Sequence, residues 1–226
     1  MLSIFGRASA SKVTAPLGRA LNSTGLTPDS VTIIGTVVSV VAAVTLFPSD
    51  HLLIGTLVIW LFVMFDMLDG AMARARGGGS KYGAVLDATC DRVADGAIFA
   101  GLSWWAIFHQ NDRPLLAAML VCLVTSQVIS YAKARAEASG LSADGGWIER
   151  SDRLVIVLVG SGLTGIGQLA SWDWLQFALP VATYFLAAAS IVTVFQRVLA
   201  VRNSAGARDI IPIQPDRNRI EPGQSS

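Results

Sequence analysis

Six long apolar segments follow one another along the chain, and they constrain its fold more than any other feature. We expect helices near residues 29–47, 52–74, 83–109, 114–136, 153–170 and 176–201. Crossing the hydrocarbon core of a bilayer takes about 20 residues of α-helix, so each segment is long enough to span a membrane. Because only helices and closed barrels satisfy their backbone groups in lipid, the sequence predicts an all-α integral membrane protein with six transmembrane helices.

Composition and charge placement agree with this fold. Hydrophobic residues make up 53% of the chain and charged residues 15%, whereas soluble domains carry about 25% charged residues. Seventeen Lys and Arg nearly balance sixteen Asp and Glu, which argues against a nucleic-acid partner. All basic residues except Arg113 lie near the N-terminus, around the second and fourth connections, or near and beyond the end of the sixth span. The positive-inside rule therefore places these regions and both termini in the cytoplasm, with the protein in the cell membrane.

Three regions follow from these patterns. We expect residues 1–28 to form a cytoplasmic segment without a signal peptide, in which Val13, Leu17 and Leu21 share one face. We expect an interfacial amphipathic helix there, with a solvated arm as the alternative. Residues 29–203 form the membrane domain, and residues 204–226 lack a helical pattern and are expected to be mostly disordered.

Four aspartates lie at the cytoplasmic ends of the second and third spans. Asp66 and Asp69 are three residues apart, and Asp87 and Asp91 are four apart, so each pair shares a helix face. The glycine-rich turn between them can fold the two helices back on each other, which brings the pairs together. An ionised aspartate near hydrocarbon costs roughly 2.5 to 3.5 kcal/mol, so we expect cations between them. Pairing with nearby basic residues at the lipid headgroups is the alternative.

Carboxylate oxygens select hard ions such as Mg²⁺, Mn²⁺ or Ca²⁺, and no suitably spaced His or Cys points to zinc. Two such ions would suit a displacement at phosphorus. Gly70 and Ala73 leave room for a bulky group against the helix, and Arg74 offers a fork for phosphate, so a nucleotide would fit. A membrane transporter is the alternative, but its carboxylates are expected near the midplane rather than at helix ends.

A second group of basic residues lies at the same cytoplasmic end. Lys133 and Arg135 end the fourth span, Arg153 opens the fifth and Arg197 lies near the end of the sixth. If the helices surround one cavity, these cations form an anion pocket. Anchoring to lipid headgroups is the alternative, and it is favoured for Arg150.

The motif D-x-x-D-G-x-x-A-R, followed after eight residues by G-x-x-x-D-x-x-x-D, runs from Asp66 to Asp91 and resembles the signature of the CDP-alcohol phosphotransferases. The resemblance implies a six-helix membrane enzyme, usually a homodimer, that transfers a CDP-linked phosphate group to an alcohol and releases CMP. It implies two Mg²⁺ ions, with Mn²⁺ as a substitute, and Asp91 as general base. The implied metal ligands are Asp66, Asp69, Asp87 and Asp91. The implied CDP-diacylglycerol-binding residues are Asp29, Ser30, Val31, Thr32, Gly70, Ala73, Arg74 and Ser80.

The strings SQVISYAKARAEASGL and GGWIERSDRL resemble the actinobacterial members of this family that join CDP-diacylglycerol to inositol 1-phosphate. The similarity covers nearly all of residues 15–200. It implies an acceptor phosphate held by Ser130, Lys133, Arg135, Arg153 and Arg197. Basic residues alone do not separate this acceptor from glycerol 3-phosphate, which other members convert to phosphatidylglycerophosphate.

Overall fold

The structure, a computed structural model, describes residues 25–210 apart from the side chains of residues 65–67. Within this range it holds six long α-helices, one 3-10 helix and no strand. They are α2 (Pro28–Leu46), α3 (Leu52–Ala75), α4 (Lys81–Phe108), α5 (Arg113–Ala138), α6 (Arg150–Ala170), η1 (Asp173–Phe177) and α7 (Ala178–Asn203). The predicted all-α fold with six long helices is confirmed. The expected interfacial helix and most of the expected tail lie outside the described residues.

Polar residues in the connections determine where the helices begin. Thr27 precedes α2, and its hydroxyl accepts a hydrogen bond from the backbone N–H of Ser30 at 3.2 Å. Asp112 precedes α5 and accepts from the backbone N–H of Leu115 at 2.9 Å. These caps satisfy backbone donors that the first turn of a helix leaves unpaired. Each span therefore starts at a position that the local sequence specifies.

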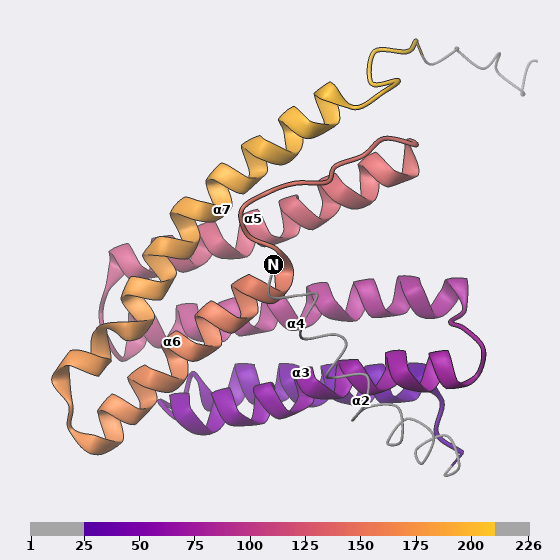
Figure 1. The fold of residues 1–226 in the computed structure, drawn as a ribbon. Helices are drawn as coiled ribbons and strands as arrows, with labels where there is room; N and C mark the ends of the chain where they lie inside the picture. Colours follow the sequence, from indigo (N-terminus) through magenta and orange to yellow (C-terminus); the bar gives the residue numbers. More distant parts are fainter. Residues whose placement is uncertain (1–24, 211–226) are drawn as a thin grey trace, which may run out of the picture.

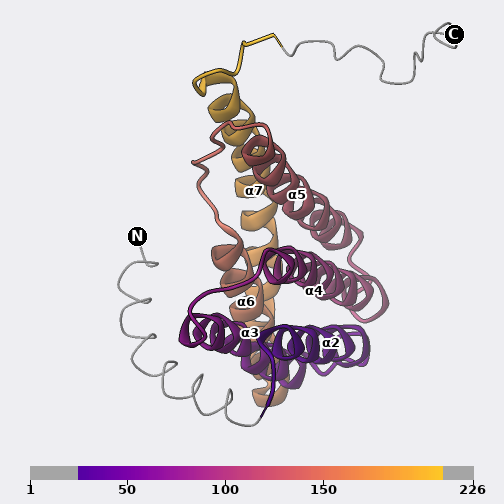
Figure 2. The same ribbon diagram turned by 90° about the vertical axis from the view of Figure 1, so that its right-hand side faces the viewer.

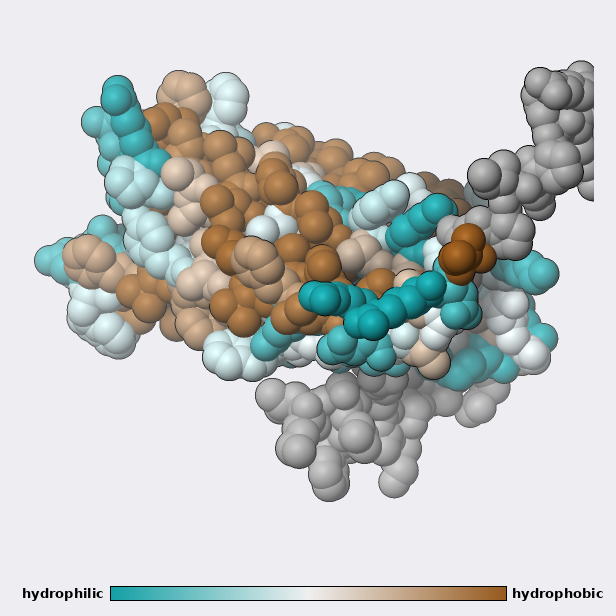
Figure 3. Space-filling view, turned by 90° about the horizontal axis from the view of Figure 1, so that it is seen from above, coloured by the Kyte–Doolittle hydropathy of each residue, from teal (hydrophilic) through white to brown (hydrophobic). Residues whose placement is uncertain are grey.

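The helices have the length and surface of membrane spans. Five of them are long and apolar enough to cross a membrane. α4 is excluded from that group by the charges in its first half, although it is the longest of the six. Large apolar side chains are exposed on the outside of the helices, and Figure 3 shows a broad apolar surface between more polar ends. This outer surface suits contact with lipid tails.

α4 lies between two groups of helices. It packs against α2 and α5, while α2 also packs against α3, α5 against α7, and α6 against both α3 and α7. Figures 1 and 2 show this arrangement from two directions. A Cβ on Gly101 of α4 would lie 2.2 Å from the backbone oxygen of Ala43 in α2. Small residues of this kind let membrane helices approach closely.

One carboxylate joins three parts of the chain at the end of the molecule opposite the glycine-rich turn between α3 and α4. Asp50, in the α2–α3 connection, accepts hydrogen bonds from Trp105 Nε1 of α4 at 2.6 Å and from Gln168 Nε2 of α6 at 3.0 Å. Three parts of the chain are therefore fixed to one another at this end. The polar residues discussed below lie at the other end.

We expect Gly101→Ala to lower the free energy of unfolding of the detergent-solubilised protein by roughly 1 to 3 kcal/mol, and with it the melting temperature, because the added methyl group overlaps the α2 backbone. Gly96, on the same helix, is a matched control, since a Cβ there would meet only Gln127 Nε2 at 4.0 Å. Gly96→Ala should be neutral or slightly stabilising. Equal melting temperatures for the two variants would contradict the close contact between α2 and α4.

Candidate active site

The turn between α3 and α4 brings the ends of the two helices together. Gly77 and Gly78 have φ angles of +93° and +141°, which side chains other than glycine rarely adopt. Ser80 follows, and its hydroxyl accepts a hydrogen bond from the backbone N–H of Gly83 at 2.8 Å, which caps α4. The aspartates before and after the turn therefore lie at one end of the helix pair.

A cavity of about 490 Å³ opens beside this turn, and we call it the α2–α4 cavity. Among the residues predicted from the sequence to bind metal or donor, it is lined by Asp29, Thr32, Asp69, Gly70, Ala73, Ser80 and Asp87. Ser30 and Val31 do not line it: the Ser30 hydroxyl bonds to Thr27 Oγ1 at 2.8 Å, and Val31 is buried. Arg74 is exposed and its guanidinium lies over Gly70. Most of the predicted donor residues are thus brought together.

Asp69 is the best-defined carboxylate of this cavity. It is 8% exposed, and the Thr32 hydroxyl of α2 donates a hydrogen bond to its Oδ2. The Asp69 and Asp87 carboxylates interact electrostatically as like charges. Two carboxylates and a hydroxyl form an all-oxygen donor set, which fits a hard divalent cation. The side chain of Asp66 lies outside the described residues.

Asp91 faces a different cavity from Asp69 and Asp87, so the carboxylates do not form one cluster. Among the described residues, no three His, Cys, Asp or Glu side chains come close enough together to hold a metal ion. Asp91 lines a cavity of about 920 Å³ between α4, α5, α6 and α7, which we call the α4–α7 cavity. Asp87 and Asp91 are one helical turn apart, a rise of about 6 Å along α4. α4 therefore contributes a carboxylate to each of two neighbouring cavities.

The α4–α7 cavity is basic. Five cationic and three anionic side chains line it, the cations being Arg92, Lys133, Arg150, Arg153 and Arg197. Ser130 lines it as well, as the sequence predicted. Arg135 does not, which differs from the expectation; it is exposed. Two residues apart on a helix, Lys133 and Arg135 point about 200° away from each other around the axis.

Two arginines in this cavity are buried without full hydrogen bonding. Arg153 is 2% exposed and Arg197 is 8% exposed. Nε and Nη1 of Arg153 and Nε of Arg197 have no hydrogen-bond partner among the described residues. Buried charged donors are costly unless they are paired. These atoms are therefore suited to bind an anion.

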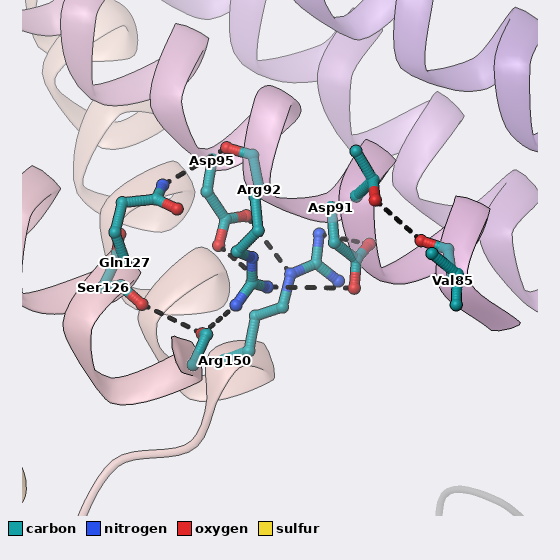
Figure 4. A network of polar contacts seen from close by, with 9 residues as sticks. Val85, Asp91, Arg92, Asp95, Ser126, Gln127 and Arg150 are labelled. Carbon is teal, nitrogen blue, oxygen red and sulfur yellow. Dashed lines mark hydrogen bonds and ion pairs between the residues drawn. The ribbon is translucent and has the colours of Figure 1, made fainter. Parts of the chain in front are cut away.

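Sequence reasoning missed part of this cavity. The sequence favours a headgroup anchor for Arg150 and gives Arg92 no role in the pocket, yet both line it and pair with Asp91 and Asp95 (Figure 4). Arg92 also donates to the Ser130 hydroxyl. Arg150 and Arg153 are three residues apart, a spacing that places both on one face of α6. That spacing was the available signal.

Comparisons of the sequence with a family model and with known proteins point to the same family. The family model for CDP-alcohol phosphatidyltransferase matches residues 25–195. A phosphatidylinositol phosphate synthase of Mycobacteroides abscessus is 59% identical over 212 residues, which cover 94% of this chain and 94% of that protein. The enzyme of the same name from Mycobacterium tuberculosis is 56% identical over 218 residues, covering 96% of this chain and 99% of that protein.

Two crystal structures of the Mycobacterium tuberculosis enzyme match this fold at 56% identity. The one with CDP-DAG bound has a TM-score of 0.83 and covers 89% of this chain and 100% of that chain. The one in complex with manganese and citrate has a TM-score of 0.84 and covers 91% of this chain and 97% of that chain.

Because Arg153 has unpaired donors, we expect inorganic phosphate to bind it and so to raise the melting temperature of the protein. A ligand present at a concentration of 100 times its Kd raises the free energy of unfolding by about 2.7 kcal/mol. Arg153→Met should abolish this shift, because it removes two unpaired donors and the charge. Arg202→Met, at the exposed end of α7, is the control and should keep the shift. A full shift in Arg153→Met, measured by thermal unfolding in detergent, would place the anion elsewhere.

Proposed function

The chain belongs to the CDP-alcohol phosphatidyltransferase family, and on that premise we propose that it transfers the phosphatidyl group of CDP-diacylglycerol to inositol 1-phosphate and releases CMP. One observation supports this proposal above the others. An acidic cavity and a basic cavity adjoin along α4, with Asp87 in the first and Asp91 in the second. A metal-bound diphosphate donor and a phosphorylated acceptor require this combination. Membership of an enzyme family leaves the transporter alternative without support.

We place the donor in the α2–α4 cavity. Gly70, Ala73 and Gly83 line it without bulky side chains, which leaves space for the nucleotide against the helices. Asp29 and Ser80 line it as well, and Arg74 is close enough to Gly70 to reach a phosphate there. A relative's structure contains CDP-DAG, which supports the same donor for this chain.

Divalent metal use is supported by the family and by a relative's structure with manganese. We propose two Mg²⁺ ions held by Asp66, Asp69, Asp87 and Asp91, with Mn²⁺ able to replace them. Such ions, when bound, neutralise the diphosphate and stabilise the leaving oxygen. Asp69 and Asp87 fit this role because they line one cavity, and the other side chains there that could bind a metal offer oxygen atoms, not nitrogen or sulfur.

The acceptor binds, in this proposal, in the α4–α7 cavity. Arg153 and Arg197 hold its phosphate with their unpaired donors, and Lys133 and Ser130 line the same cavity from α5. Asp91 accepts the proton of the attacking hydroxyl, since it faces this cavity from the α4 side. Holding the phosphate fixes the direction of the hydroxyl, which raises its effective concentration at the donor.

Two further proposals follow from the charge pattern and the family resemblance. The end of the molecule that carries both cavities also carries most of the basic residues, so we place it in the cytoplasm. We also propose that residues 29–203 form the catalytic domain and that the enzyme is a homodimer.

The purified protein should release CMP from CDP-diacylglycerol and Mg²⁺ when inositol 1-phosphate is supplied. Free inositol should be a very poor acceptor, because it has no phosphate for Arg153 and Arg197.

Arg197→Ala should raise the KM for inositol 1-phosphate by about tenfold or more and leave the donor KM nearly unchanged. The control is Arg202→Ala, five residues further along α7 and exposed. Faster turnover of glycerol 3-phosphate than of inositol 1-phosphate would instead assign phosphatidylglycerophosphate synthesis.

We expect Asp91→Asn to lower kcat by about 10² to 10⁴, because an amide cannot take the acceptor's proton. Binding of CDP-diacylglycerol should be largely retained, since Asp91 does not line the α2–α4 cavity. Asp173→Asn, the same change in η1 outside both cavities, serves as the control. Retention of more than about a tenth of the wild-type rate would remove Asp91 from the role of base.

A further inference from the structure

Four charged side chains form a connected group beside the α4–α7 cavity (Figure 4), and all of them except Asp95 line that cavity. Asp91, Arg92 and Asp95 come from α4, and Arg150 is the first residue of α6. Arg150 pairs with two carboxylates at once: Nη2 lies 2.8 Å from Asp91 Oδ1, and Nε lies 3.3 Å from Asp95 Oδ1. Its guanidinium therefore bridges a proposed site residue and a carboxylate outside the family motif.

Asp95 is the fixed member of this group. Its side chain is 3% exposed, and its second oxygen lies 3.5 Å from Arg92 Nη2. Removing Arg150 would leave this buried carboxylate with Arg92 as its remaining ion-pair partner, and weakening the compensation of a buried charge is unfavourable. The contact between Asp95 and Arg150 Nε should therefore persist when other contacts of Arg150 change.

Asp91 is the exchangeable member. Its side chain is 19% exposed against 3% for Asp95, so losing an arginine costs it less. A divalent cation that binds Asp91 would compete with Arg150 Nη2 for that carboxylate. Once displaced, Nη2 would stay beside the cavity, because Nε of the same guanidinium contacts Asp95, and it would be available to an anion.

We propose that Arg150 is a positioning residue held by Asp95, whose Nη2 exchanges Asp91 for the phosphate of the acceptor when a divalent cation binds that carboxylate. The proposal rests on the function proposed above and deepens it. Metal and acceptor are then coupled through one side chain: the cation frees the guanidinium that the acceptor needs. The acceptor in turn removes a competitor of the cation.

The test is a pair of measurements that should move in opposite directions in Arg150→Gln. Mn²⁺ alone, titrated into the detergent-solubilised full chain and followed by electron paramagnetic resonance, should bind about threefold more tightly, because a competing ion pair is lost. The KM for inositol 1-phosphate should rise about tenfold, because a charged hydrogen bond is lost. A purely structural role would weaken both.

Two variants separate competition from net charge. Lys133→Gln removes the same charge from the same cavity, but Lys133 pairs with Glu137, so Mn²⁺ affinity should change much less. Arg150→Lys keeps the charge but cannot bridge two carboxylates, and Mn²⁺ should still bind more tightly than in the wild type. Unchanged or weaker Mn²⁺ binding in both Arg150 variants would overturn the proposal, as would an equal gain in Lys133→Gln.

Failure of the proposed function would look different. If the wild type turns over no phosphorylated alcohol, the function is wrong whatever Arg150 does. If the wild type uses inositol 1-phosphate while Arg150→Gln has an unchanged acceptor KM, the function stands and the exchange of Arg150 is wrong.

Discussion

Charges placed among apolar helices must be compensated inside the protein, and this constraint determines how the polar end of the bundle is built. Water is scarce between the helices, so each buried carboxylate needs a donor or a cation within reach. Asp95 takes Arg92 and Arg150, and Asp69 takes the Thr32 hydroxyl. Each of these contacts joins two helices or holds a cavity wall. The polar groups of the site therefore also hold α2 to α3 and α4 to α6.

α4 has a special position for the same reason. It is the helix that charge excludes from the apolar spans, and it packs between α2 and α5. Its apolar second half is held by close backbone contact, as Gly101 shows against Ala43. Its polar first half is therefore placed between the two cavities, where carboxylates one turn apart face different ligands. A helix of uniform hydropathy would span the membrane equally well and would carry no site.

Much of this structure could be predicted from the sequence, because both the spans and the aspartate motif are local patterns. Helix bounds follow from apolar length and caps such as Thr27 and Asp112. Pairs between helices were harder. The sequence favours a headgroup anchor for Arg150, and it does not reveal the partners Asp91 and Asp95, which lie 59 and 55 residues earlier in the chain. Arg135 was placed in the pocket by its charge, although its helical spacing from Lys133 argues against a shared face.

The two cavities have opposite charge, and the proposed chemistry explains why. Three carboxylates and one guanidinium line the α2–α4 cavity, a formal charge of −2, whereas the α4–α7 cavity has a formal charge of +2. Cations in the first and an anion in the second would each be stabilised by the side chains around them, and by each other across α4. Two phosphate-bearing substrates would otherwise repel at the distance that transfer requires. Separating the charges between two cavities thus allows both substrates to approach while the formal charges of the two linings cancel.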